Sequence, residues 1–216
     1  MNDFAVIFDM DGVIVDSSRF HEESWNVLAR EVGWTLPPGF FKKTFGMRNI
    51  CIIPDFLEPG ASAERILRLS ARKEELFRQL VEGQVSLLPG VRSLVGELHR
   101  AGIRFSVGSS TERKNIEMIL ETTGIAPYFH ALVSSEDVTR GKPAPDVFLM
   151  AAKKMEIPPS QCVVIEDAQV GIDAAAAAGM VCLALATTHP AESLSGYRRV
   201  VPNLEKIRIE DLKSLF

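Results

Sequence analysis

Residues 4–12, with the sequence Phe-Ala-Val-Ile-Phe-Asp-Met-Asp-Gly, decide the fold of this chain. The run from Phe4 to Phe8 is short, apolar and rich in residues that favour strands, and it stops at a polar turn. A continuous apolar run without alternation is typical of a strand that is covered on both faces of a parallel sheet. We therefore expect a buried strand that ends immediately before Asp9.

Further apolar runs follow along the chain and alternate with helical patterns. Several of these helical patterns close on a glycine, such as Gly102 or Gly179, as helix C-termini often do. This alternation predicts an α/β fold, a doubly wound, mostly parallel and Rossmann-like sheet with helices on both faces. The expected strands are 4–8, 103–107, 131–133, 162–165 and 181–185, and the expected helices are 91–101, 115–123, 146–155 and 171–178.

Residues 17–84 interrupt this alternation. They contain two helical patterns, 22–32 and 63–82, which are separated by segments with proline and glycine, and no strand pattern lies between them. We expect a small helical cap domain inserted after the first strand. Residues 1–16 and 85–216 would then form the α/β core.

Composition and charge exclude several classes of protein. Of the 216 residues, 46% are hydrophobic and 24% are charged, which is typical of a globular chain, and the formal net charge of −4 argues against a nucleic-acid partner. No apolar stretch approaches the ~20 residues of a membrane helix, and the first residues show no targeting pattern. The three cysteines are too widely spaced for a disulfide framework or a thiolate metal site. We expect a cytoplasmic monomer without membrane or nucleic-acid partners.

Polar residues follow each of the predicted inner strands. In an open parallel sheet, ligands bind beyond the carboxyl ends of the strands, close to the point where the strand order reverses. We expect the side chains at these ends to converge on one site. They are Asp9 and Asp11 after the first strand, Ser109 and Ser110 after the second, Lys142 in the loop after the third, and Glu166 and Asp167 at the fourth.

The two acidic pairs suggest phosphate chemistry that depends on a metal. Asp9 could attack phosphorus and form an aspartyl-phosphate, and Asp11 could protonate the leaving oxygen and later deprotonate water. Each pair alone has a structural explanation, because aspartate is common in turns and acids are common at helix N-termini. Two pairs at one end of one sheet would repel each other without a cation, which favours a hard ion such as Mg²⁺ beside Glu166 and Asp167.

Ser109 and Lys142 complete this predicted site. The Ser109 hydroxyl could donate a hydrogen bond to a phosphoryl oxygen. Lys142, next to the stiffening Pro143, could offset the charge of phosphate and carboxylates together. Each signal is weak alone, because serines are common in loops and lysines on surfaces.

Together these residues resemble the haloacid dehalogenase-like hydrolase superfamily, and within it the β-phosphoglucomutase-like group of capped sugar-phosphate phosphatases. The resemblance spans nearly the whole chain. The matching motifs are Asp9-Met10-Asp11-Gly12-Val13, Ser109, Lys142-Pro143-Ala144-Pro145-Asp146, and Glu166-Asp167 with Gly171 and 177–180.

The resemblance implies a Mg²⁺-dependent phosphatase for a small phosphorylated metabolite, a sugar phosphate, beneath a mobile cap that excludes water. Asp9 would be the nucleophile and a metal ligand, and Asp11 the general acid/base and a ligand through its backbone carbonyl. The remaining implied roles are metal binding by Asp167 and by Glu166, directly or indirectly, and phosphate binding by Ser109, Ser110 and Lys142.

The expected cap offers two candidate substrate contacts, His21 and Arg48. The related mutases carry an arginine where Asn49 aligns here, and residues 71–73 show no clear match to their second basic sugar contact. Both differences favour a phosphatase over the alternative, a β-phosphoglucomutase-type phosphosugar mutase.

Two further alternatives fit the sequence less well. The haloacid dehalogenases themselves lack an acid at the position of Asp11 and need no magnesium. In a phospho-receiver domain the acidic pair precedes the phosphorylated aspartate by a whole βα unit, and no cap is expected. A pseudo-enzyme is also disfavoured, because every catalytic position of the family is filled in this chain.

Overall fold

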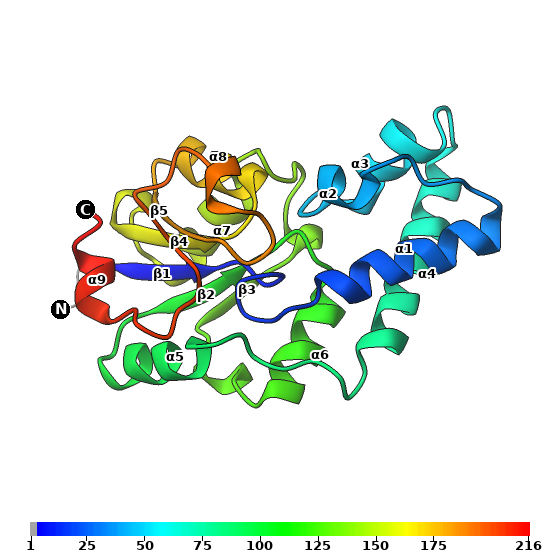
Figure 1. The fold of residues 1–216 in the computed structure, drawn as a ribbon. Helices are drawn as coiled ribbons and strands as arrows, with labels where there is room; N and C mark the ends of the chain where they lie inside the picture. The colour runs from blue at the N-terminus through cyan, green and yellow to red at the C-terminus, as the bar shows by residue number, and fades with distance from the viewer. Residues whose placement is uncertain (1–3) are drawn as a thin grey trace.

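The computed structural model describes residues 4–216, and the strands of this part form one parallel sheet in the order β3-β2-β1-β4-β5-β6 (Figure 1). The parallel α/β fold predicted from the sequence is confirmed. The strand order reverses at β1, which pairs with β2 on one side and β4 on the other. The strands are β1 Ala5–Phe8, β2 Phe105–Gly108, β3 Ala131–Val133, β4 Cys162–Glu166, β5 Val181–Leu185 and β6 Arg199–Val201.

Helices cover both faces of the sheet. In β1, Val6 and Phe8 pack against the helices of one face, whereas Ala5 and Ile7 pack against those of the other, and all four are fully buried. This two-sided burial explains the continuous apolar run. The first face is covered by α5 Val91–Arg100, α6 Arg113–Thr123 and α9 Ile209–Lys213, and the second by α7 Asp146–Met155 and α8 Gln169–Ala177.

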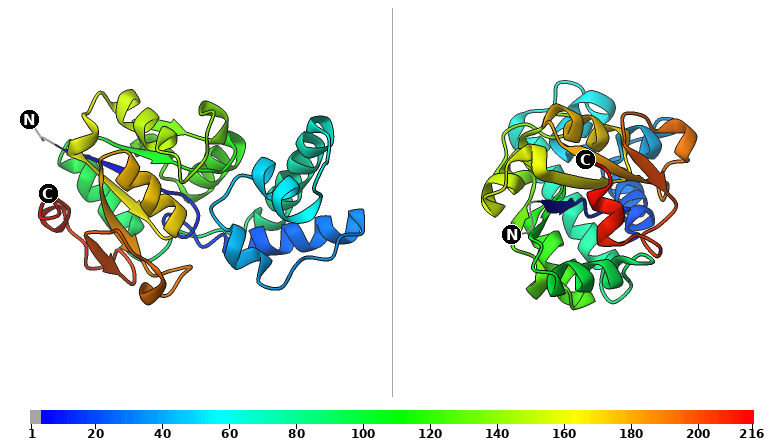
Figure 2. Two further views of the ribbon diagram at one scale, coloured as in Figure 1. Left: turned by 90° about the horizontal axis from the view of Figure 1, so that it is seen from above. Right: turned by 90° about the vertical axis from the view of Figure 1, so that its left-hand side faces the viewer.

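Residues 18–81 form a separate helical lobe beyond the carboxyl ends of the strands (Figures 1 and 2). Its two long helices pack against each other, and an apolar cluster that includes Trp25, Phe40 and Leu76 lies within the lobe. The helical lobe contains α1 Ser18–Val32, α2 Phe40–Thr44, α3 Asn49–Ile52, a π-helical segment Ile53–Leu57 and α4 Ala63–Val81. The lobe therefore has its own core and overhangs the edge where the predicted site residues end their strands.

The remaining connections contain short 3-10 helices at Ala126–Tyr128, Ser135–Asp137, Pro159–Gln161 and Ala191–Ser193. Among residues 4–216, none of the helices has the length and apolarity that crossing a membrane demands. The connections that matter most for function are those after β1, β2, β3 and β4, because they face the helical lobe.

Candidate active site

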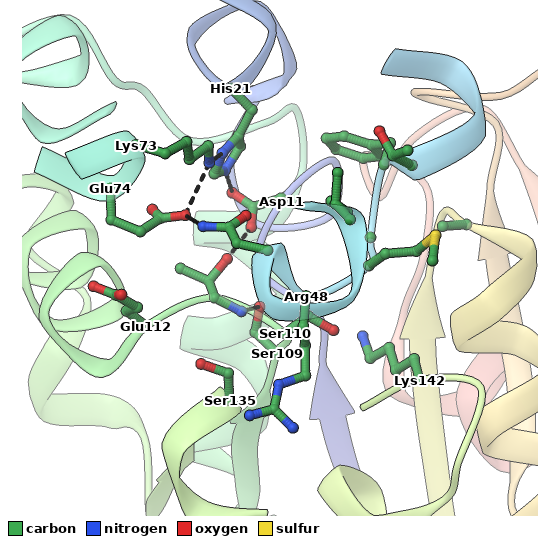
Figure 3. Close-up of a pocket in the computed structure, with 18 of the residues that line it drawn as sticks. Asp11, His21, Arg48, Lys73, Glu74, Ser109, Ser110, Glu112, Ser135 and Lys142 are labelled. Atoms are coloured by element: carbon green, nitrogen blue, oxygen red, sulfur yellow. Dashed lines mark hydrogen bonds and ion pairs between the residues drawn. The ribbon is translucent and has the colours of Figure 1, made fainter. Parts of the chain in front are cut away.

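One cavity lies between the strand ends and the helical lobe, and Figure 3 shows 18 of the residues that line it. The strand ends contribute every site residue predicted for the core. The helical lobe contributes both predicted contacts, His21 and Arg48, together with Lys73 and Glu74. The fold thus brings together predicted site residues that lie up to 158 positions apart, from Asp9 to Asp167.

The turn after β1 places Asp9 and Asp11 in buried positions at this edge. Gly12 continues the turn with a φ of 79°, in the left-handed region that favours glycine. A Cβ atom at Gly12 would overlap the carboxylate of Asp167. Glycine is therefore required here for two reasons, the backbone conformation and the close approach of the acidic residue after β4.

Lys142 joins two carboxylates that come from different strands. Its Nζ lies 2.7 Å from Asp9 Oδ1 and 2.6 Å from Glu166 Oε1. Burial lowers the pKa of Lys142, but the negative charges of Asp9 and Glu166 outweigh this and hold the pKa above its ordinary value. Lys142 is therefore a buried cation that organises the nucleophile candidate.

Both carboxylate oxygens of Glu166 are occupied. Oε1 accepts from Lys142, and Oε2 accepts from the backbone N–H groups of Asp167 and Ala168, each at 2.7 Å. A Cβ atom at Gly171 would overlap this carboxylate. The first turn of α8 is thus shaped to hold Glu166 in one position.

Asp9, Glu166 and Asp167 could hold a metal ion. Their candidate ligand atoms all lie within 4.8 Å of one another, and the buried Oδ2 of Asp167 has no hydrogen-bond partner. Burial, opposed by Lys142, raises the pKa of Asp9 to about 7, and burial together with Glu166 raises the pKa of Asp167 well above its ordinary value. The negative charge of these three buried carboxylates exceeds the positive charge that Lys142 supplies. Since Mg²⁺ prefers oxygen ligands, these residues fit such an ion.

The loop after β2 brings two serines to the same cavity. Ser109 is buried, and its Oγ accepts a hydrogen bond of 3.2 Å from the backbone N–H of Thr111. The Oγ of Ser110 is buried as well and has no partner. Both hydroxyl groups are therefore free to donate to a ligand beside Asp9.

Asp11 is held by donors from three segments. Its Oδ1 accepts from the Ser17 hydroxyl and lies 3.1 Å from His21 Nε2, and its Oδ2 accepts from Thr111 Oγ1 at 2.5 Å. Burial raises the pKa of Asp11, but His21 and the hydroxyl groups lower it by a larger amount. The net effect is a pKa below the ordinary value. This arrangement favours the ionised form of Asp11, which faces the helical lobe (Figure 3).

Lys73 and Glu74 of α4 extend this network, and the sequence analysis missed both. Lys73 Nζ lies 2.6 Å from His21 Nδ1 and 2.9 Å from Glu74 Oε1. The tautomer of His21 that satisfies both contacts accepts from Lys73 at Nδ1 and donates from Nε2 to Asp11. Lys73 is the basic residue of the segment 71–73 that lines the cavity, although no match to the second basic sugar contact of the mutases was predicted there. The available signal was helical spacing, because Lys73 lies between Leu69 and Phe77 on the buried face.

Glu74 connects the helical lobe to the core. Its Oε1 also accepts from Asn49 Nδ2 at 2.7 Å, and its Oε2 accepts from Asn115 Nδ2 of α6 at 2.5 Å. Burial raises the pKa of Glu74, but Lys73 and His21 lower it by a larger amount. The net effect is a pKa below the ordinary value. Glu74 is therefore a charged, buried group with donors from three helices.

Arg48 also lines the cavity, but its guanidinium reaches the core loop that precedes Lys142. Its Nη1 donates to the carbonyl of Thr139 at 2.9 Å and lies 3.5 Å from that of Val138. Figure 3 shows the guanidinium on the side of Ser135, away from His21. The two predicted contacts from the lobe, His21 and Arg48, thus lie in different parts of the cavity.

The comparisons with known proteins agree with this geometry. Residues 5–179 match the family model of the haloacid dehalogenase-like hydrolases. The chain is 34% identical over 213 residues to a chloroplastic 5-amino-6-(5-phospho-D-ribitylamino)uracil phosphatase of Arabidopsis thaliana, which covers 98% of this chain but 57% of that protein. It is 35% identical over 177 residues to a fructose-1-phosphate phosphatase of Escherichia coli, covering 82% of this chain and 93% of that protein.

A solved structure also matches along the whole chain. The β-phosphoglucomutase of Clostridium difficile superposes with a TM-score of 0.88 at 28% sequence identity, covering 100% of this chain and 97% of that one. Similarity of this kind extends to phosphatases and to a mutase, so it does not separate the two activities.

Proposed function

The chain belongs to the haloacid dehalogenase-like hydrolases, and we propose that it is a Mg²⁺-dependent phosphatase that releases phosphate from a small phosphorylated metabolite, a sugar phosphate. The observation that supports this most strongly is the arrangement of Asp9, Lys142, Glu166 and Asp167 at one sheet edge. It combines a nucleophile candidate, a buried cation and an acidic group that fits a hard metal ion. The names of the two phosphatase relatives support the reaction type.

In the proposed reaction, the free carboxylate oxygen of Asp9 attacks phosphorus, and the bond from phosphorus to the leaving oxygen breaks. This gives an aspartyl-phosphate, while Asp11 delivers a proton to the leaving oxygen. Water then attacks phosphorus and gives a proton back to Asp11, which releases Asp9 and inorganic phosphate. Both steps transfer the phosphoryl group, so their barriers depend mainly on charge and position.

The core residues would hold the phosphoryl group during both steps. Lys142, Ser109 and Ser110 would donate to its oxygens. Asp9, Asp167 and the backbone carbonyl of Asp11 would hold Mg²⁺, which supplies positive charge to the phosphoryl oxygens when bound. Because both oxygens of Glu166 already have partners, we propose that Glu166 acts mainly by fixing Lys142.

The acid role of Asp11 requires a change in its surroundings. The donors Ser17, His21 and Thr111 stabilise its ionised form, which cannot protonate a leaving group. We propose that the helical lobe acts as a cap, with boundaries near residues 17 and 84. A shift of α1 would withdraw His21 and allow Asp11 to take up a proton.

A β-phosphoglucomutase-type activity is the second candidate, because the whole-chain match to such a mutase has a TM-score of 0.88. A mutase would keep a bisphosphate intermediate and return it in the opposite orientation. A screen of phosphorylated metabolites that measures both free phosphate and isomerised product separates the two. Isomerised sugar phosphate without free phosphate would favour the mutase.

The proposal is tested by hydrolysis of p-nitrophenyl phosphate with Mg²⁺ and after its removal by a chelator. We expect Mg²⁺-dependent turnover that falls by about a thousandfold or more in Asp9→Asn, because the substituted amide is a poor nucleophile. Asp173→Asn, at an exposed position of α8, is the matched control and should retain full activity. Turnover by Asp9→Asn close to that of the wild type would refute the assignment of the nucleophile.

A further inference from the structure

Besides the acidic residues at the strand ends, the cavity is lined by two carboxylates, Glu74 of α4 and Glu112 at the start of α6. Glu74 is 5% exposed, and Glu112 is partly buried. Burial raises the pKa of Glu112, and the charge of Glu74 raises it further, so the two carboxylates influence each other. A ligand that extends from Asp9 toward the helical lobe meets this acidic pair.

The cations near the two carboxylates already have partners. Lys73 is bound to Glu74 at 2.9 Å. Arg78, which does not line the cavity, lies 3.4 Å from Glu112 and donates to Asn115 Oδ1 at 2.9 Å. Arg48 is bound to backbone carbonyls of the core loop. Thus, within residues 4–216, each lysine or arginine that lines the cavity has a protein partner.

Glu74 still has room to accept one more hydrogen bond. A carboxylate offers about four acceptor positions, and Lys73, Asn49 and Asn115 use three of them. A hydroxyl or amino group of a leaving group can donate to the remaining position. A second phosphate has no such donor when ionised, and it would lose water in order to lie beside negative charge.

On the basis of the proposed phosphatase activity, we propose that the substrate is a phosphate monoester whose leaving group is uncharged, carries hydroxyl or amino donors and has no second phosphate. Glu74 and Glu112 select against bisphosphates, and Glu74 binds a donor of the leaving group. This preference also opposes a mutase cycle, because a mutase must hold a bisphosphate in both orientations.

A matched pair of ligands tests the proposal. Fructose 1-phosphate and fructose 1,6-bisphosphate differ only in the second phosphate, and each is measured as a competitor of p-nitrophenyl phosphate hydrolysis. We expect the monophosphate to inhibit at a concentration at least about tenfold lower than the bisphosphate, because like charges in a partly buried site repel. Equal inhibition, tighter binding of the bisphosphate, or no inhibition by either ligand contradicts the proposal.

Charge-removing variants identify the residues responsible. Glu112→Gln and Glu74→Gln should each reduce the ratio of the two inhibition constants by about threefold or more. Glu117→Gln, at an exposed position of the same helix as Glu112, should leave the ratio unchanged. The ratio is compared within one protein, so a loss of stability affects both ligands alike. An unchanged ratio in both test variants contradicts the role of the two carboxylates.

Arg48→Gln tests a cation of the cavity lining whose partners are neutral backbone carbonyls. We expect this variant to change the inhibition by both ligands equally. A selective loss of bisphosphate binding would show that Arg48 forms a second phosphate site and would overturn the proposal. Failure of the wild type to hydrolyse p-nitrophenyl phosphate with Mg²⁺ would contradict the proposed function itself, whereas hydrolysis without discrimination contradicts only this inference.

Discussion

The two halves of the cavity handle charge in opposite ways. At the strand ends, Lys142 contacts both Asp9 and Glu166, and one oxygen of the nearby Asp167 has no partner. In the helical lobe, Lys73 and Glu74 neutralise each other within a network of hydrogen bonds. The first half therefore lacks positive charge and suits a metal ion together with a phosphoryl group. In the second half, the lysine and arginine of the lining have protein partners and two carboxylates line the cavity, so this half suits an uncharged leaving group.

The two halves also differ in how their side chains are held. At the strand ends, the backbone approaches the site closely, since a Cβ atom at Gly12 or Gly171 would overlap a carboxylate of the site. In the helical lobe, position is set by side-chain hydrogen bonds, such as those from Lys73 to His21 and Glu74. We expect substitutions in the first half to affect both Mg²⁺ binding and turnover. Substitutions in the second half should affect mainly turnover.

After the loss of the nucleophile itself in Asp9→Asn, the largest effect is expected for Gly171→Ala. Glycine to alanine in a helix is ordinarily favourable, but here the added methyl group displaces Glu166 and with it Lys142. We expect p-nitrophenyl phosphate turnover to fall by about a hundredfold, because misplacement of about 1 Å near the reacting groups has effects of that size. The stabilisation of the protein by Mg²⁺, measured as the shift in melting temperature, should fall as well.

Gly96→Ala provides the matched control for this variant. Gly96 lies within α5, and a Cβ atom there meets nothing within 4 Å. This substitution should raise the free energy of unfolding by up to about 1 kcal/mol and leave turnover unchanged. If Gly171→Ala behaves like Gly96→Ala, the strand-end half is more adaptable than its geometry indicates.

The sequence was more informative about the strand ends than about the helical lobe. Asp9 and Lys142 are 133 positions apart, yet both could be placed together, because parallel strands deliver their carboxyl ends to one edge. Lys73 and Glu74 were missed because a helix in isolation does not show which neighbour its inner face meets. Their partners, His21 and Asn115, lie on helices whose packing depends on the whole fold.

The same contrast explains the errors in the secondary structure. The inner strands were predicted from continuous apolar runs that the sheet buries on both faces. β6 was missed, since Arg199 is exposed and the strand spans only Arg199–Val201. The first helix of the lobe begins at Ser18, four residues before the predicted Glu22, because Phe20 is the one apolar residue of the first turn and defines no helical period by itself.

A smaller effect is expected for Lys73→Met, which keeps the length of the side chain but removes its charge. Glu74 keeps two donors, so we expect the free energy of unfolding to fall by roughly 1–3 kcal/mol. His21 and Glu74 lose the partner that positions both of them in the cavity, so turnover should fall by about tenfold. The stabilisation by Mg²⁺ should be unchanged, because Lys73 does not contact the strand-end carboxylates.

Arg68→Met, at an exposed position of the same helix, is the control for Lys73→Met and should affect neither turnover nor stability appreciably. Loss of the Mg²⁺-dependent shift in Lys73→Met would mean that the two halves of the cavity are coupled more closely than their separate contacts indicate.

The smallest effect concerns the dependence of stability on pH. It tests whether the buried carboxylates of the strand-end half have too little positive charge beside them. In the metal-free protein, burial raises the pKa of Asp9 from 3.8 to about 7, with Lys142 opposing the shift. Between these values the folded state binds more protons than the unfolded state, so the stability of the metal-free protein should fall as pH rises from about 4 to 7. Mg²⁺ favours the ionised carboxylate, so the increase in melting temperature that it causes should be larger at pH 7.5 than at pH 5.5, by about 2–5 °C.

Asp9→Asn should lose most of this pH dependence, whereas Asp173→Asn should retain it. Equal shifts at the two pH values would show that the carboxylates are already ionised without the metal, and that the charge difference between the two halves is smaller than their contacts indicate.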